Sequence, residues 1–249
     1  MDNFLIILFS LFSSVFFLLT VLILRVANRR QKQKIMPDIL LIPGKVYLFW
    51  NFRQGFLFPD IWMDNPRGRM EEDNWILRCL NIGHGTAKNI CLFWDYDIVE
   101  LSRLIMENDR NKFLKIKHSM NYLCIDIMFP REKYPELPEH CSIGINDHEE
   151  PEITYLLPAG INKTHQRMPV PKSYLTLVSL LYFIRHLNKD SGNIEGKVPL
   201  CRLVLEYDDI ENRAYRSSYS VGFRNIKYSQ EEPGPNVLFC RAEIFINQV

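Results

Sequence analysis

The hydrophobic and polar positions of this chain fall into two parts, and the first is a long apolar segment. Residues Phe4 to Leu24 contain no charged residue, no proline and no glycine. A helix rises about 1.5 Å per residue, so this segment spans roughly 30 Å, the thickness of the hydrocarbon core of a bilayer. Its three serines and one threonine can return their hydroxyls to backbone carbonyls one turn earlier. The pattern predicts a transmembrane helix within residues 1–25.

A basic segment follows the apolar one and sets the expected orientation. Its five cations, with no acid among them, are Arg25, Arg29, Arg30, Lys32 and Lys34. Because positive residues favour the cytoplasmic side, we expect a single-pass inner-membrane protein whose body lies in the cytoplasm, joined by a basic juxtamembrane linker at 26–36. A cleaved signal peptide would need a basic start, a shorter apolar core and a small-x-small cleavage site, and the sequence has none of these.

The remaining residues, 37–249, alternate between short strand-like runs and turn residues. Pro43-Gly44 is a turn dipeptide between Ile35–Ile42 and Lys45–Phe52, and this arrangement predicts a hairpin. A second pair of strands is predicted at Trp75–Asn81 and Asn89–Tyr96. Alternating apolar and polar positions predict further strands at Tyr122–Phe129, Glu152–Leu157, Cys201–Tyr207, Tyr215–Phe223 and Leu238–Ile246, with Asp208–Asn212 closing a hairpin.

Two helices are expected in this part of the chain. Asp97 can cap a helix that ends at Asn108, and Ser173 is placed to cap one that ends near Leu187. The second helix is apolar almost all the way round from Tyr174 to Ile184, which is too short to cross a bilayer. A helix lying on the membrane surface would show a strongly charged face, so we favour burial against the sheets or against a second copy of the protein.

The other segments are predicted as loops. They are a solvated basic link with Lys112, Lys115, Lys117 and His118, an irregular proline-rich segment from Pro130 to Pro151, and the segment from Pro158 to Lys172. Together the elements predict a mainly β fold, with an N-terminal transmembrane helix and an immunoglobulin-like β-sandwich that carries two packed helices.

Composition narrows the function classes. After the basic segment, acidic residues slightly outnumber basic ones, whereas a nucleic-acid surface shows a basic excess, so we expect no specific nucleic acid binding. The six cysteines form no Cys-x-x-Cys pair, and four of them lie in apolar runs, where free cysteine behaves as a small hydrophobe. In the expected cytoplasmic location the thiols are reduced.

Two segments invite a ligand interpretation. Gly83 and Gly85 lie in a glycine-rich loop, but a phosphate-binding loop leads into a helix, and the run after Asn89 has the β-branched and aromatic composition of a strand. His140, Cys141, Asp147 and His148 form the one metal-like group, but they lack the paired short spacings of a zinc site. We therefore expect neither a cofactor nor a metal.

Enzyme signatures are also missing. The sequence has no Gly-x-Ser-x-Gly elbow, no His-Glu-x-x-His, no Walker lysine and no dinucleotide fingerprint, and we assign no catalytic residue. One alternative is a membrane-bound hydrolase that uses His140, Cys141 or Asp208, although a hairpin turn favours aspartate for structural reasons. Another alternative is a membrane-tethered receptor for a nucleotide signal, which would need a basic pocket lined by aromatic residues.

The pattern Asn81-x-Gly83-x-Gly85-x-Ala87-x-Asn89 resembles a loose group of bacterial membrane-anchored β-sandwich proteins. Tyr155-Leu-Leu-Pro158 and the hairpin from Tyr207 to Tyr215 are similar to strand ends and turns of such sandwiches. The resemblance implies a fold, and by analogy with some small membrane-anchored proteins of this kind it implies an effector or sensor in bacterial anti-phage defence.

Taken together, the sequence predicts a membrane-anchored binding or effector module that works through protein contacts. Its expected partners are the lipid bilayer, a second copy of the chain and an unidentified protein. Tethering to a membrane raises the effective concentration of such partners.

Overall fold

The computed structural model describes residues 2–34, 36–50, 58–64, 76–119, 122–128, 132, 139–146, 152–188, 198–229 and 237–249. In chain order its elements are α1 (Asp2–Lys34), β1 (Ile39–Ile42), β2 (Lys45–Trp50), β3 (Ile61–Met63), β4 (Ile76–Asn81), β5 (Ala87–Asp95), α2 (Ile98–Asn108), β6 (Leu114–Ser119), β7 (Tyr122–Met128), β8 (His140–Asn146), β9 (Glu152–Leu156), β10 (Gln166–Pro169), α3 (Lys172–Leu187), β11 (Cys201–Asp208), β12 (Ala214–Tyr228) and β13 (Val237–Gln248). The predicted mainly β class is confirmed.

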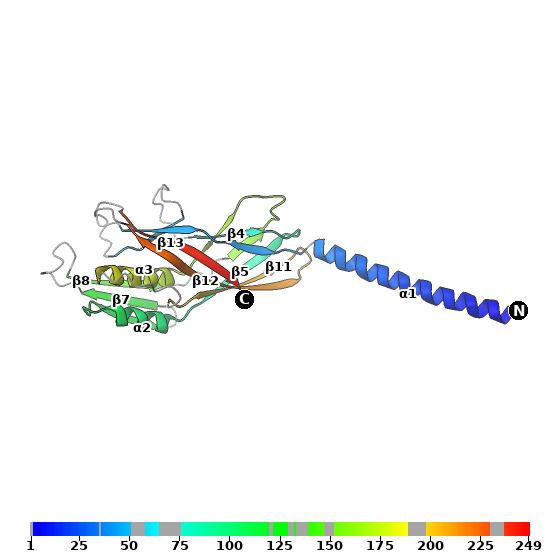
Figure 1. The fold of residues 1–249 in the computed structure, drawn as a ribbon, viewed down its shortest axis with the longest axis horizontal. Helices are drawn as coiled ribbons and strands as arrows, with labels where there is room; N and C mark the ends of the chain where they lie inside the picture. Colours follow the sequence, from blue (N-terminus) through cyan, green and yellow to red (C-terminus); the bar gives the residue numbers. More distant parts are fainter. Residues whose placement is uncertain are drawn as a thin grey trace.

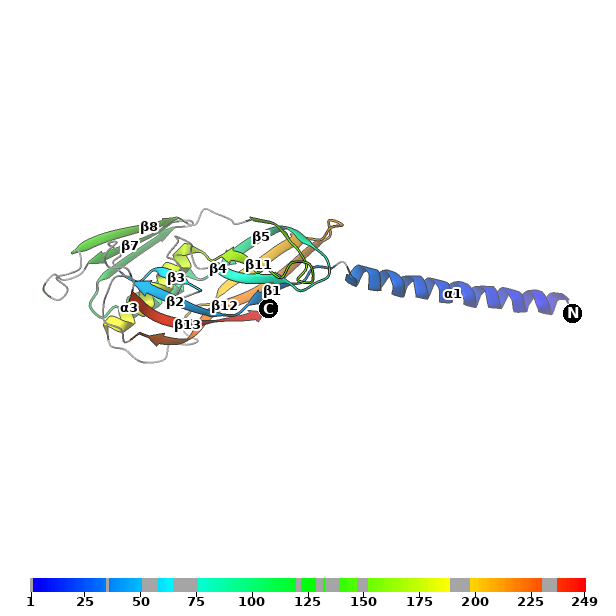
Figure 2. The same cartoon turned by 90° about the horizontal axis from the view of Figure 1, so that it is seen from above.

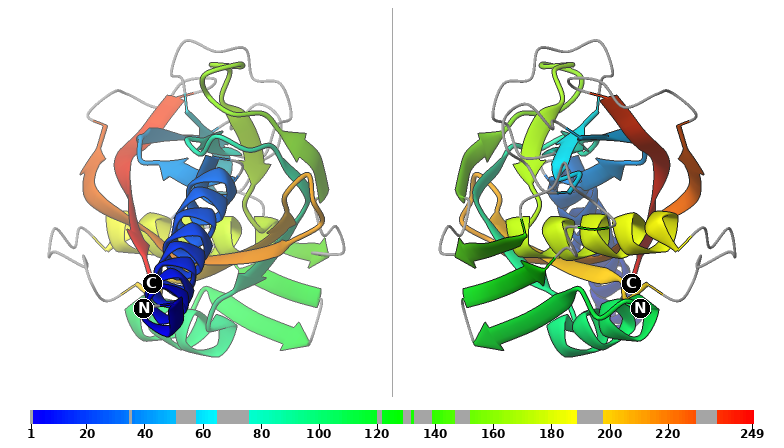
Figure 3. Two further views of the ribbon diagram at one scale, coloured as in Figure 1. Left: turned by 90° about the vertical axis from the view of Figure 1, so that its right-hand side faces the viewer. Right: turned by 90° about the vertical axis from the view of Figure 1, so that its left-hand side faces the viewer.

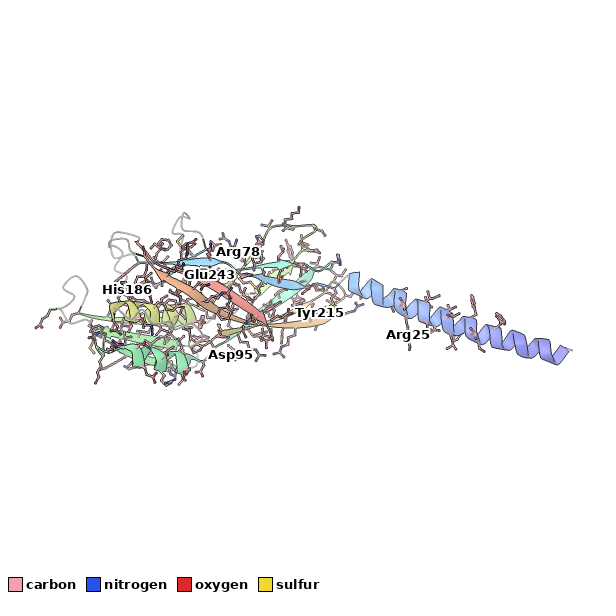
Figure 4. All side chains as sticks on the ribbon, viewed as in Figure 1. Arg25, Arg78, Asp95, His186, Tyr215 and Glu243 are labelled. Atoms are coloured by element: carbon pink, nitrogen blue, oxygen red, sulfur yellow. The ribbon has the colours of Figure 1, made fainter. Side chains whose placement is uncertain are left out.

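Helix α1 extends away from the β-rich body, and Arg25 projects from it (Figures 1 and 4). The helix continues through the basic segment to Lys34, and the apolar side chains from Phe12 to Leu24 are exposed except for that of Val21, which is partly covered. Among the residues that the structure describes, no helix has the length and apolarity needed to cross a membrane. The transmembrane assignment of 1–25 therefore stays a prediction.

Three antiparallel sheets make up the body. A curled seven-stranded sheet has the order β3-β2-β13-β12-β11-β5-β9, and two three-stranded sheets have the orders β1-β4-β10 and β6-β7-β8. The predicted hairpin of the C-terminal region is confirmed, because β11 pairs with β12 from Cys201↔Val221 to Asp208↔Ala214. The last strand, β13, pairs with both β12 and β2.

Helix α3 fills the inside of one half of the seven-stranded sheet (Figure 3). Every residue from Ser173 to Arg185 is buried. The Trp62 indole on β3 donates to the Ser179 hydroxyl at 2.7 Å, and the Tyr228 hydroxyl on β12 donates to the Tyr182 carbonyl at 3.1 Å. The sheets of the same chain therefore bury this helix, as the predicted apolar surface requires, and a membrane-surface position is excluded by its burial.

The sheet β1-β4-β10 covers the other half of the seven-stranded sheet, at the end of the body from which α1 leaves (Figure 2). We call this the α1 end. Inward residues such as Leu41 on β1 and Cys79 on β4 are buried, and the Tyr219 hydroxyl on β12 donates to the Ile39 carbonyl on β1. This half of the body is thus a two-layered sheet packing.

Two predicted strand pairs were wrong in their pairing. Strands β1 and β2 flank Pro43-Gly44 but belong to different sheets, and so do β4 and β5, which flank the glycine-rich loop. Both turns carry the chain from one sheet layer to the other. Alternation alone cannot distinguish a hairpin from such a crossover, because both give two half-buried strands around a turn.

Three strands were missed because the sequence around them resembles loops. Strand β6 lies in the basic link, β8 in the proline-rich segment and β10 in the predicted loop before α3. Each is an outer strand of a three-stranded sheet, where polar and charged residues are tolerated on the solvent face.

The two body helices were placed correctly, with one error in capping. Asp97 caps α2 by accepting from the Glu100 amide at 2.8 Å. In α3 the position before the helix is Pro171, and the Ser173 hydroxyl instead meets the Tyr96 hydroxyl. Helix α2 packs on α3, where the Arg185 guanidinium donates to the Asn108 side-chain oxygen at 3.2 Å.

Candidate functional site

The residues of the hydrolase alternative lie at opposite ends of the body. His140 and Cys141 begin β8, in the sheet farthest from α1, whereas Asp208 ends β11 at the α1 end (Figure 1). Figure 4 shows the same separation, with His186 near the first end and Tyr215 near the second. The structure therefore does not bring the proposed hydrolase residues together.

The thiol chemistry at Cys141 is also unfavourable. Burial raises the pKa of the Cys141 thiol, and the thiolate is the form that acts as nucleophile or metal ligand. Of the metal-like group, Asp147 and His148 lie outside the described residues. Within the part of the chain that the structure describes, no three histidine, cysteine or acidic side chains gather as metal ligands would.

His186, in the last turn of α3, packs against aromatic rings. Its ring lies 5.2 Å from the rings of both Tyr228 and Phe239, measured between centroids. This covering lowers the pKa of His186, because a desolvated imidazole favours the neutral form. In the structure His186 therefore contributes an aromatic packing contact at the end of α3.

The glycine-rich loop forms a junction between the body and the segment that follows α1. Asn81 is fully buried, and its side-chain amide donates to the carbonyls of Gly85 at 2.7 Å and Leu156 at 3.0 Å. Its side-chain oxygen accepts from the amides of Asp38 and Gly83, both at 3.0 Å. One side chain thus joins three segments that are distant in sequence.

The backbone of the same loop completes the junction. The Ile82 amide donates to the Asp38 carbonyl at 2.8 Å, and the amides of His84 and Gly85 donate to the Met36 carbonyl at 3.2 Å each. We call these contacts, together with those of Asn81, the Asn81 clamp. Because these amides are occupied within the protein, the loop does not offer them to a phosphate, in agreement with the sequence-based interpretation.

Gly83 is required by the close approach of the two chains. A Cβ at this position would lie 2.4 Å from the Asp38 amide nitrogen and 2.5 Å from the Met36 carbonyl oxygen. Both are backbone atoms held by the clamp, so neither can move aside cheaply. A glycine is therefore needed here for the packing of the junction and does not indicate a ligand site.

The acidic hairpin turn beside this junction is structural. Asp209 is fully buried, and its carboxylate accepts from the amides of Glu211 at 2.8 Å and Arg213 at 3.0 Å and from the Tyr215 hydroxyl at 3.0 Å. These bonds close the β11–β12 turn, as expected for aspartate in a turn. The Asp209 carboxylate therefore stabilises the turn through these hydrogen bonds.

The open side of the sheet β6-β7-β8 is the other candidate surface, and we call it the distal face. Along β7, Leu123, Ile125 and Ile127 are buried, so the alternate residues point outward. The strand registers place Lys115, Lys117, Tyr122, Cys124, Asp126, Met128, His140, Ser142 and Gly144 on this face. Tyr122 is 50% exposed and Met128 is 41% exposed, which leaves an aromatic and a thioether side chain among polar ones.

The polar groups of the distal face bind one another. The Ser142 hydroxyl donates to the Asp126 carboxylate, and the Lys117 ammonium lies 3.6 Å from the same carboxylate. The Ser142 bond, assisted by Lys117, lowers the pKa of Asp126 against a smaller effect of burial. Such a carboxylate is a weak base, so this geometry favours contact with a partner over activation of Ser142 as a nucleophile.

The sequence alone does not indicate that Asp126 and Ser142 are neighbours. The alternation of apolar residues with Tyr122, Cys124 and Asp126 along β7 is a signal of one wet face, but the partner strand β8 lies in a proline-rich segment. Without β8 the pairing of Asp126 with Ser142 is invisible in the sequence.

Comparison of the chain with protein-family models, with curated proteins and with solved structures finds no match in any of the three.

Proposed function

We propose that this chain is a single-pass, membrane-anchored binding or effector module that works through protein contacts. The apolar sequence Phe4–Leu24, its helical conformation in α1 and the cations after it support the anchor and a cytoplasmic body. The resemblance of the Asn81 loop to membrane-anchored β-sandwich proteins supports a sandwich related to the immunoglobulin type at the α1 end, and a role in bacterial anti-phage defence.

The Asn81 clamp is the observation that carries this proposal. A passive tether needs a loose connection, whereas here the segment Met36–Asp38, which begins two positions after the last residue of α1, is bonded to the β4–β5 loop of the body. A displacement of this loop, caused by a partner, would therefore move the segment that follows α1. Such a connection suits a module whose contacts in water change the state of a helix in the membrane.

The distal face supplies a surface for those contacts. It lies at the end of the body opposite α1, and α2 and α3 pack on the other side of its sheet (Figures 1 and 2). Exposed aromatic and methionine side chains are typical of contact surfaces. Both a second copy of the chain and a different protein could bind the distal face. Self-association through α1 would link binding at the distal face to contacts in the membrane.

A photo-crosslinking experiment tests the proposal. A benzoylphenylalanine in place of Tyr122 on the distal face is compared with one in place of Phe93, which is 41% exposed on the outer side of β5. Two differently tagged full-length copies are expressed together in membranes and irradiated. We expect a discrete adduct from Tyr122 and none from Phe93, and co-isolation of the two tags. Monomers without adducts from either site under all conditions would contradict the proposal.

The hydrolase alternative predicts a different result in the same system. Alanine at His140, Cys141 or Asp208 would abolish function without lowering the protein level. The binding module predicts that alanine is tolerated at Cys141 and Asp208, which lie outside the distal face.

A further inference from the structure

Exposed apolar side chains gather at the α1 end. Met36, in the segment after α1, is 45% exposed, Ile82 in the β4–β5 loop is 49% exposed, and Ile161 in the β9–β10 loop is 74% exposed. Much of the surface of these side chains has no packing partner in the chain itself. When several such tips meet at one place, an interaction surface is indicated.

The three segments are held side by side. The Asn81 clamp bonds the Ile82 amide to the Asp38 carbonyl at 2.8 Å, and the Ala159 amide donates to the Asn81 carbonyl at 2.7 Å. Figures 1 and 2 show these loops at the end of the body that the last turn of α1 adjoins. The exposed isoleucines are thus presented on a fixed platform beside the proposed anchor.

The charge around this platform has one sign on the side of the β9–β10 loop. Residues 157–172 contain Lys163, Arg167 and Lys172 and no acidic residue, and Lys163 is exposed two positions after Ile161. The β11–β12 hairpin at the same end is acidic, and Arg213 pairs with Glu211 there. Because its net charge is negative, we leave this hairpin out of the proposed surface. We define the docking surface as Met36, Ile82, Ile161 and Lys163.

We propose that the docking surface lies on an anionic lipid bilayer beside α1. The isoleucines would enter the interfacial layer, and Lys163 would approach lipid phosphates, where a surface cation contributes about 1 kcal/mol, a factor of about five in binding. This inference rests on the proposed membrane anchor. It adds that the body has a bound orientation on the membrane and is not held free above it.

Helix length determines the tilt that docking requires. The ten residues from Arg25 to Lys34 extend α1 by about 15 Å beyond its apolar segment, whereas each headgroup layer is only roughly 5–8 Å thick. An upright α1 would therefore hold the loops clear of the lipid. Transmembrane helices tilt by about 20° on average and up to about 40°, and a tilt toward the β9–β10 loop lowers the docking surface to the headgroups.

Photoactivatable phospholipids test this arrangement on the full chain in vesicles. One probe carries its diazirine at the headgroup and a second carries it in the acyl chain, and labelled peptides are mapped by mass spectrometry. The vesicles contain phosphatidylcholine alone or mixed with phosphatidylglycerol. We expect the headgroup probe to label the peptides that contain Ile82 and Ile161 in the anionic vesicles. The peptide of α2 that contains Val99, an exposed valine away from the α1 end, should remain unlabelled.

Paired variants give the matched control. The variant Ile161→Asp/Lys163→Glu should lower headgroup labelling of these loops by at least about fivefold. Val99→Asp/Lys117→Glu makes the same charge change at exposed positions far from α1 and should leave the labelling unchanged. Equal effects of the two variants would overturn the docking surface.

The two probes separate failure of this inference from failure of the anchor. Acyl-chain labelling of Phe4–Leu24, without headgroup labelling of the loops, would keep the anchor and overturn docking. Absence of acyl-chain labelling in α1 would overturn both. Crosslinks that join the docking surfaces of two copies, in place of lipid adducts, would also overturn lipid docking and assign the surface to self-association.

Discussion

At the scale of single residues, the Asn81 clamp depends on one buried amide. Replacing Asn81 with alanine leaves the Asp38 amide and the carbonyls of Gly85 and Leu156 without their side-chain partner. Each unsatisfied buried group costs about 1–3 kcal/mol, so for these three groups we expect a loss of at least about 3 kcal/mol in the free energy of unfolding. Chemical denaturation of the full chain in detergent measures it. Asn247→Ala, at an exposed position of β13, is the control and should change stability by less than about 0.5 kcal/mol.

Two glycines provide a second matched pair. At Gly83 a new methyl group would lie 2.4 Å from the backbone nitrogen of Asp38, whereas at Gly160 it would meet nothing within 4 Å. Gly83→Ala should therefore destabilise the fold by more than about 2 kcal/mol, while Gly160→Ala should be neutral or stabilise it by up to about 1 kcal/mol. Melting temperatures of the two variants, measured side by side, check the difference. Similar melting temperatures would show that the junction is looser than described.

The third residue-scale prediction concerns pH. Burial, opposed by the charge of Lys172, raises the pKa of Asp60 to about 6 from an ordinary value of 3.8. Its Oδ1 atom is buried and has no hydrogen-bond partner among the described residues. Because the folded state holds this proton more tightly than the unfolded chain does, ionisation destabilises the fold as pH rises from about 4 to about 6.

Asp60→Asn removes that ionisation. We compare the free energy of unfolding of the variant with that of the native chain at each pH. This difference should favour the variant by up to about 3 kcal/mol more at pH 7.5 than at pH 4. Urea denaturation at the two pH values measures the difference. An equal effect at both values would mean that the Asp60 carboxyl does not change its charge between them.

At the scale of elements, α3 is the centre of the fold because the sheets surround it. Leu180 is fully buried, and its replacement by alanine opens a cavity between the helix and the sheet. We expect a cost of about 2–5 kcal/mol, against less than about 0.5 kcal/mol for Val99→Ala on the exposed side of α2. Thermal unfolding of the two variants provides the measurement. A small effect at Leu180 would contradict the central position of α3.

The same helix shows what the sequence predicts well. An apolar surface on all sides of Tyr174–Ile184 requires burial, and its length excludes a membrane span, so both conclusions follow from residues alone. The partner surfaces do not follow, because Trp62 and Tyr228, which bond to this helix, lie on strands distant in sequence. Local pattern determines that an element is buried, and long-range pairing determines what buries it.

For the two candidate surfaces as well, the sequence shows the local elements but not the contacts between them. The glycines of the Asn81 loop are visible in the sequence as a turn, but its role as a junction depends on Met36 and Leu156, which only the folded chain brings to Asn81. The distal face was missed because β8 begins at His140, inside a segment rich in proline and charge. In both cases the hydrogen bonds join segments that are distant in sequence and adjacent only in the folded chain.

At the scale of the whole molecule, the proposed orientation in the membrane determines the compartment of every surface described above. The cations after Leu24 are the sequence feature on which this proposed orientation rests. Activity of alkaline phosphatase requires the periplasm, so a fusion at Val249 should be inactive, whereas a fluorescent protein at the same position should be fluorescent.

Moving the charge should reverse that result. Replacing Arg25, Arg29, Arg30, Lys32 and Lys34 with glutamine, and adding lysines before Phe4, places the positive excess on the other side of the apolar segment. The bias then favours the opposite insertion, and the alkaline phosphatase fusion should become active while the fluorescent fusion loses its signal. An active alkaline phosphatase on the native chain would instead place the body in the periplasm. The thiols would then meet an oxidising compartment, and the cytoplasmic partners proposed for the distal face would be excluded.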